Sequence, residues 1–123
     1  MKANWTILTE EEDAAFDAAM REWQQKLNLM DWRIERGRRA PVSSMAMVQI
    51  SFGARLAAYR TGNWGCAAPT PHSIRETALH ESLHILLAEF KHLVSSSASA
   101  DLIESAEHRV ITTLEKILIG ATA

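Results

Sequence analysis

The 123-residue chain is 47% hydrophobic and 23% charged, a composition typical of a globular protein. Its length corresponds to about one domain, so we expect residues 1–123 to fold around one core. The net charge of −2 provides no overall attraction to nucleic acid or to an anionic membrane, and we expect neither partner. A local basic run has arginine at positions 33, 36, 38 and 39, which we interpret as solvated charge.

The single cysteine, Cys66, limits both the compartment and the chemistry. An intramolecular disulfide is excluded, as are zinc sites rich in thiolates, so any metal must be held by histidine and carboxylate. The N-terminal residues lack the apolar segment of a signal peptide, and no apolar run approaches the length of a membrane span. We therefore expect a cytoplasmic protein.

The first predicted element is a helix over about residues 10–27. Thr9 and Glu12 have the spacing of a capping box, in which each side chain satisfies a backbone N–H group of the other residue. Apolar residues then recur every three or four positions: Phe16, Met20, Trp23 and Leu27. A stripe with this spacing indicates one helix face packed against a core.

Three short strands are predicted next, over residues 32–35, 45–52 and 55–60. The first alternates apolar and charged residues, and the second alternates more loosely. The third segment could form a strand or a helical turn; we favour a strand, because the segment is too short for a stable helix and turn residues follow it. Residues 37–44 and 61–65 carry the proline, serine and glycine residues of loops and turns.

Two further helices complete the chain. Ser73 and Glu76 form a second capping-box pattern, which predicts a helix over about residues 74–92. After a polar linker, Asp101 has the position of a cap for a last helix that ends near Gly120. The order of helix, three strands, helix and helix predicts an α+β fold with a small three-stranded sheet.

The predicted helix over 74–92 contains the pattern His80-Glu81-x-x-His84. On a helix, histidines at i and i+4 lie on one face and can bind one Zn²⁺, with the glutamate placed to act as a general base. A five-residue match can arise by chance. Here, however, Leu79 and Leu83 make the helix apolar beside the histidines, and buried polar groups need partners. A metal would satisfy both imidazoles.

A zinc site that keeps an open position for water needs a third protein ligand. The extended metzincin pattern requires glycine at 87 and histidine at 90, where this chain has Leu87 and Phe90, so that class is excluded. A carboxylate from the last helix is the remaining common solution. Glu107 lies at the centre of that helix's apolar stripe, which comprises Ile103, Val110, Ile111, Leu114 and Leu118.

Other polar residues of the last helix are weaker candidates. Glu104 lies about 60° from the centre of the stripe and is our second choice for the ligand. Glu115, at about 80°, is expected to be solvated. His108, at about 100°, is either a surface residue, a group that supports a ligand, or a hydrogen-bond donor to the transition state.

These residues resemble the minimal zincins, small metallopeptidase domains related to the SprT-like and ImmA/IrrE groups and found in many bacterial and phage proteins. The resemblance is carried by the strand D-W-R-I, by TALHESLHILL and by AEHRVITTLEKIL. It implies zinc held by His80, His84 and Glu107, with Glu81 as the general base. SprT-like members use a third histidine instead, and this chain has no evident equivalent unless His92 or His108 serves.

The resemblance also implies that the strand before the motif helix, over about 56–59, forms the edge of the cleft and pairs with an extended substrate. We therefore expect a zinc-dependent peptidase that acts on a peptide or protein through a metal-activated water. Tyr59 or His108 would assist as donor to the oxyanion. The alternative is a zinc-stabilised binding or regulatory module without hydrolysis, although such a module needs no general base. A metal-free structural protein with an accidental motif is the third possibility.

Overall fold

The computed structural model describes residues 6–37 and 42–122, which form four helices and one sheet. In chain order the elements are α1 (Glu10–Lys26), β1 (Arg33–Arg36), β2 (Ala46–Ser51), β3 (Leu56–Thr61), α2 (Pro71–Leu86), α3 (Ala88–Val94) and α4 (Ala100–Thr122). The predicted α+β class is confirmed, and each strand begins and ends within one residue of its predicted bounds. Arg38 and Arg39, with part of the predicted loop over 37–44, lie outside the described residues.

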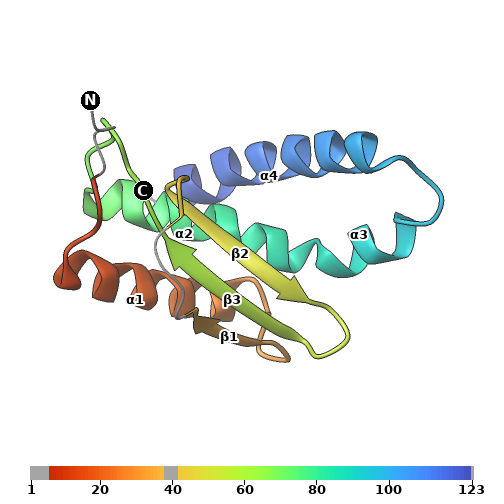
Figure 1. Ribbon diagram of the computed structural model, residues 1–123, viewed down its shortest axis with the longest axis horizontal. Coiled ribbons are helices and arrows are strands. Elements are labelled where there is room, and N and C mark those ends of the chain that lie inside the picture. Colours follow the sequence, from red (N-terminus) through yellow and green to blue (C-terminus); the bar gives the residue numbers. More distant parts are fainter. Residues whose placement is uncertain (1–5, 38–41, 123) are drawn as a thin grey trace.

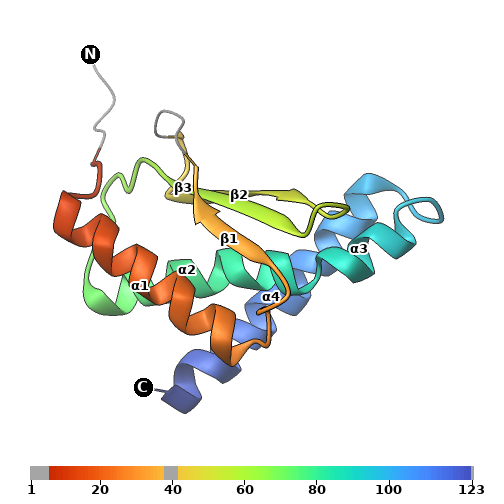
Figure 2. The ribbon, with the colours of Figure 1, turned by 90° about the horizontal axis from the view of Figure 1, so that it is seen from below.

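The sheet has the strand order β1-β3-β2, so β3 is central. It pairs in parallel with β1, where Arg33 lies opposite Leu56, and antiparallel with β2, where Val48 lies opposite Tyr59. The helices cover one face of the sheet (Figure 2). Within the helical layer, α2 lies between α1 and α4 (Figure 1). The motif helix is therefore the central element of the fold.

Helix α1 forms as its sequence pattern predicts. The Thr9 hydroxyl accepts the Glu12 N–H at 3.2 Å, and the Glu12 carboxylate accepts the Thr9 N–H at 2.9 Å. The apolar stripe faces the core, where its three largest members are buried: Phe16, Met20 and Trp23. The capping box and the stripe thus fix both the start and the rotation of α1.

A bidentate ion pair joins α1 to α2. The Arg75 guanidinium donates to the two carboxylate oxygens of Glu22 at 2.8 and 3.0 Å, and it lies 4.8 Å from the centre of the Trp23 ring. The indole N–H of Trp23 donates to the Arg75 carbonyl at 3.0 Å. These contacts hold the first turns of the motif helix against α1.

The start of α2 differs from the prediction. Its N-cap is Thr70, whose hydroxyl accepts the Ser73 N–H at 3.1 Å, and Pro71 occupies the first turn. Ser73 is therefore inside the helix, and its proposed box with Glu76 is wrong. Proline suits the first turn because it lacks an N–H and has a helical φ, so the helix begins three residues earlier than expected.

The predicted continuous helix over 74–92 is also wrong in one respect, because α2 ends and α3 begins on either side of Leu87. Neither glycine nor proline occurs at this break, so the sequence gives no local signal for it.

Helix α4 begins before Asp101: Ser99 Oγ accepts the Leu102 N–H at 3.3 Å. Gly120 lies inside α4 and does not end it. None of the helices in the described residues is both long and apolar enough to cross a membrane.

Candidate metal centre

The rotation of α2 determines where its motif points. Leu79 and Leu83 are fully buried against the core. His80 and His84 each follow one of these leucines by one position, so both imidazoles lie on the side of α2 that is turned away from the deepest part of the core. Glu81 is only 6% exposed. The apolar residues around the motif therefore place its two histidines at the edge of the core.

The histidines open into a cleft of about 890 Å³ between β2 and the helices. The β2 side of the cleft is mostly apolar, and the helical side carries the histidines and the carboxylates. Its lining comprises Ser44, Ala46, Met47, Val48, Ile50 and Phe52 on one side, and His80, Glu81, His84, Ala88, Lys91, His92, Ser95, Glu104, Glu107 and His108 on the other. The site is thus reached from a groove that is large enough for a peptide.

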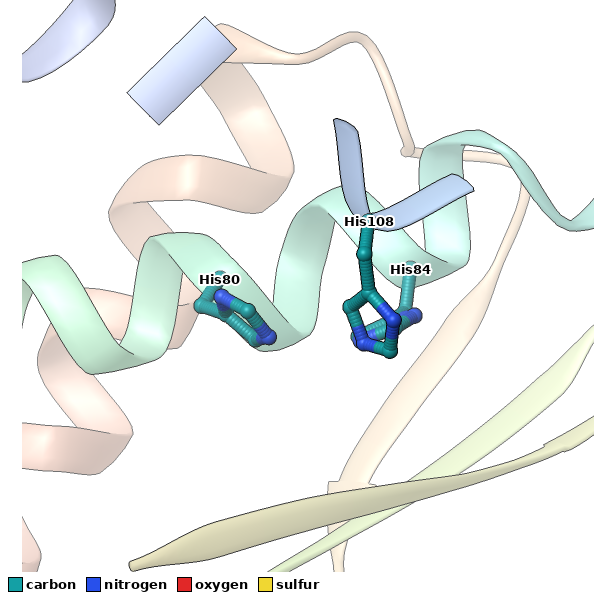
Figure 3. Close-up of side chains that lie close together, drawn as sticks. All are labelled: His80, His84 and His108. Atoms are coloured by element: carbon teal, nitrogen blue, oxygen red, sulfur yellow. The ribbon is translucent and has the colours of Figure 1, made fainter. Parts of the chain in front are cut away.

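A third histidine joins the two of the motif. His108 extends from α4 towards His84 (Figure 3), and one ring nitrogen from each of His80, His84 and His108 lies within 4.8 Å of the others. Tetrahedral zinc ligands at about 2.0 Å from the metal lie roughly 3.3 Å apart, so small ring rotations would bring these nitrogens to coordinating distance. The donor set of three imidazoles suits Zn²⁺.

Glu107, the predicted third ligand, contacts a histidine. Its Oε2 accepts a hydrogen bond from Nδ1 of His84 at 3.0 Å, and its Oε1 accepts one from Lys91 Nζ at 3.2 Å. Burial raises the pKa of Glu107, but the hydrogen bonds and charges of His84 and Lys91 outweigh it, and the pKa is lowered overall. An ionised carboxylate only accepts, so Nδ1 of His84 carries the proton and Nε2 keeps its lone pair for a metal.

His80 has an equivalent partner. Its Nδ1 makes a short contact with Oε1 of Glu115, whose side chain is 17% exposed. The expectation that Glu115 is solvated is therefore wrong. Both motif histidines thus present Nε2 to the cleft, with a carboxylate behind each ring. This carboxylate–histidine arrangement is the usual support of a zinc ligand, so the residues present fit a metal.

Glu81, the glutamate of the motif, lines the same cleft as the three histidines. Within the described residues its carboxylate forms no hydrogen bond or ion pair. Burial raises its pKa to about 7; Glu115 adds to the rise, and His80 opposes it. A buried carboxylate that faces a cleft without a partner is costly, which is typical of functional groups.

The remaining candidates are distributed as follows. Glu104 is exposed and lines the cleft, as does His92, which stacks on Phe52 with ring centres 4.6 Å apart. Tyr59 is buried outside the cleft, and its hydroxyl donates to Asp17 at 2.5 Å, so the suggestion of an oxyanion donor there is wrong. His72 pairs with Glu76 at 3.3 Å on the surface of α2.

The expected cleft edge is also different. Residues 56–59 belong to β3, which is paired on both sides, so they cannot add a substrate strand. The strand beside the cleft is β2, an edge strand that pairs, among the described residues, with β3 alone. Strand order depends on contacts far apart in sequence, which the local pattern did not contain.

One signal in the sequence could have identified the other site residues. Glu104, His108 and Glu115 are spaced at i, i+4 and i+11, which places all three on one flank of α4. A flank with three groups of this chemistry, beside a core-facing Glu107, indicates a site rather than random surface charge. The pattern was missed because each residue was judged separately, by its angle around the helix axis from the apolar stripe.

Comparison with known proteins yields no relative: no family model, curated protein or solved structure matches the chain.

Proposed function

We propose that the chain is a zinc-dependent peptidase of the minimal-zincin kind, with His80, His84 and His108 as the zinc ligands. The convergence of three imidazoles from α2 and α4 beside a buried glutamate is the observation that supports this proposal. Glu107 as the third ligand remains the prediction from sequence. The two assignments differ in which α4 residue a metal requires, and this difference can be measured.

Each chain group has a defined task in this proposal. A bound Zn²⁺ would supply Lewis acidity and lower the pKa of a water to about 7. The Glu81 carboxylate accepts the proton of the attacking water and delivers it to the nitrogen of the leaving amine. Glu107 and Glu115 hold the protons on Nδ1 of His84 and His80, and so keep the rings in the orientation that ligation needs.

The shape of the cleft supports an extended peptide as substrate. Within residues 6–37 and 42–122 no strand pairs with the outer edge of β2, so a further strand can be added there. Backbone hydrogen bonds to such an edge bind a peptide with little dependence on its sequence. Val48, Ile50 and Phe52 add an apolar wall along the cleft. The peptide carbonyl would thereby be presented to the helical side, where the histidines lie.

The proposal is tested by measuring zinc content and peptide hydrolysis on the same preparations. We expect one zinc per chain in the wild type and cleavage of a mixture of quenched fluorescent peptides that a chelator abolishes. Glu81→Gln should retain zinc but lose hydrolysis by roughly 10²-fold or more. Glu104→Gln is the matched control, because it neutralises another carboxylate of the same cleft.

Three results would contradict the proposal. A wild type without bound zinc, and without a thermal shift on adding zinc, would favour the metal-free alternative. Zinc-loaded wild type that cleaves no peptide would exclude peptidase activity and favour a zinc-stabilised binding module. Glu81→Gln that cleaves as fast as the wild type would exclude Glu81 as the general base.

A further inference from the structure

Helix α4 has a second apolar face that belongs neither to the core nor to the metal site. Its members recur at helical spacing: Leu102, Ala106, Val110, Thr113 and Ile117. Their mean direction is about 100° around the helix axis from Glu107, on the flank opposite to His108. Leu102 is 68% exposed and Ile117 is 59% exposed. Large apolar side chains grouped in this way on a surface mark an interaction site.

The apolar face of α4 forms a groove together with α3. Phe90, which is 67% exposed, and Val94 form the opposite wall of a cavity of about 210 Å³, and Leu102, Ala106 and Val110 line the α4 side. We call this cavity the α3–α4 groove. Two helices that leave an apolar groove between them can receive the apolar face of a third helix.

Charge around the α3–α4 groove has one sign. Arg109 and Lys116 are exposed at the border of the apolar face of α4, about 60° and 80° around the axis from its centre. Neither lines the groove, and neither forms an ion pair within the described residues. The acidic side chains of α4 other than Glu107 lie on the opposite flank: Asp101, Glu104 and Glu115. Glu107 is buried, with Lys91 bonded to it at the groove's edge.

The α3 wall of the groove likewise has no exposed acidic residue facing the groove. The groove-lining residues of α3 lie within about 100° of one another around its axis, and Glu89 lies on the far side. No exposed acidic residue of either helix therefore faces the groove. An occupant with acidic residues beside its apolar ones would be attracted, whereas a basic one would be repelled.

We propose that the α3–α4 groove binds an amphipathic helix of a partner protein, with an apolar stripe flanked by acidic residues. A second copy of this chain fits less well. Antiparallel pairing of two α4 helices through this face, centred near Val110, would bring Arg109 of each copy close together, and like charges at an interface are unfavourable. The groove's concave shape also favours inserted side chains over a flat bilayer.

The binding test uses a defined probe and the full chain. The probe is a fluorescein-labelled helical peptide of about 16 residues, with leucine at i, i+4, i+7 and i+11 and glutamate beside the leucines. The control peptide has lysine in place of each glutamate. Fluorescence anisotropy should show tighter binding of the acidic peptide, with an affinity that falls as salt is added.

Variants then locate the bound peptide. Leu102→Ser and Phe90→Ser should each weaken the acidic peptide by roughly tenfold. Leu93→Ser is the matched control, because Leu93 is 69% exposed on α3 but does not line the groove. This variant should bind the acidic peptide as tightly as the wild type does. The double variant Arg109→Glu and Lys116→Glu should reverse the preference between the two peptides. Circular dichroism establishes that each variant is folded.

Four results would overturn the proposal. They are equal affinity for the two peptides, equal loss of affinity in Leu93→Ser, self-association that Leu102→Ser abolishes, and binding to phosphatidylglycerol vesicles without binding to the acidic peptide. The third would assign the groove to a second copy, and the fourth to an anionic membrane. None of these measurements depends on zinc or on hydrolysis.

Discussion

Nδ1 of His84 donates a hydrogen bond to Oε2 of Glu107 at 3.0 Å across the interface between α2 and α4. This bond uses the proton on Nδ1 of His84 and leaves the lone pair of Nε2 available to a metal. The residue that the sequence predicts as a ligand thus contacts one of the other two predicted ligands, and His108, the third ligand of the proposed site, is one position further along the chain.

The first prediction separates the two candidates for the third ligand. Glu107→Gln should weaken zinc binding by roughly 10–100-fold, because it removes a carboxylate that supports His84. His108→Ala should lower the zinc affinity further, because it removes a proposed coordinating nitrogen. Competition with a fluorescent chelator measures both affinities. His92→Ala is the matched control, since His92 lines the cleft but stacks on Phe52.

The opposite order of effects would return the ligand role to Glu107. If His108→Ala binds zinc as tightly as the wild type and Glu107→Gln binds none, the site consists of two histidines and a glutamate. The side chain of Glu107 would then have to turn away from Lys91 when zinc binds.

The second prediction concerns Glu115. If its carboxylate holds the Nδ1 proton of His80, Glu115→Ala should weaken zinc binding by roughly 10–100-fold. Glu115→Gln retains an oxygen that can accept the same hydrogen bond and should recover part of the loss. Unchanged zinc affinity in Glu115→Ala, by the same competition assay, would show that the contact does not support the ligand.

The fold was predictable where the signals are local. The capping box of Thr9 and Glu12 and the apolar stripe after it gave α1 correctly, and the core-facing position of Glu107 was identified from its helical stripe. Alternating residues located the first two strands, and the third was located by its short length before a turn. These features depend on neighbours within one or two turns of chain, and sequence patterns report such neighbours directly.

The rest depends on contacts between distant segments. Strand order follows from where β1 docks, which no local pattern encodes. The role of His108 depends on the distance between α2 and α4: a helical wheel gives the direction of a side chain but not the element that it meets. Glu115 was misjudged for the same reason, because its wheel position suggested solvent although His80 lies opposite.

The third prediction concerns acid stability. Hydrogen bonds from Arg75 and Lys26 lower the pKa of Glu22 from 4.5 to about 2. Because the folded-state pKa is the lower one, the stabilisation by this carboxylate is complete above about pH 4.5 and is lost as the pH falls through about 2. The difference in free energy of unfolding between wild type and Glu22→Gln should follow this course in urea titrations.

Glu35→Gln serves as the control for this titration, because its ion pair with Arg33 is exposed and lies within one strand. It should change stability little at any pH. If the difference in free energy of unfolding between wild type and Glu22→Gln stays constant from pH 7 to pH 2, the pair with Arg75 does not stabilise the contact between α1 and α2. High salt should reduce the effect, because the Glu22 side chain is 35% exposed.

The fourth prediction concerns Gly62, which follows β3 and lies against the segment that leads into β2. A Cβ at this position would lie 2.1 Å from the Val42 carbonyl oxygen and 2.3 Å from that of Ser44. Both are backbone atoms, so Gly62→Ala must displace the chain and should cost about 1–3 kcal/mol of unfolding free energy. Gly53→Ala is the matched control, because nothing lies within 4 Å of its added Cβ.

The displaced segment contains Ser44 and leads to Ala46, both of which line the cleft, while the three histidines are on helices α2 and α4. Gly62→Ala should therefore lower the urea midpoint while zinc affinity per folded chain stays unchanged, because no ligand is on the moved backbone. Equal stability of the Gly62→Ala and Gly53→Ala variants would show that the chain accommodates the Cβ without strain. A loss of zinc affinity in folded Gly62→Ala would show instead that the position of β2 and the arrangement of the histidines are coupled.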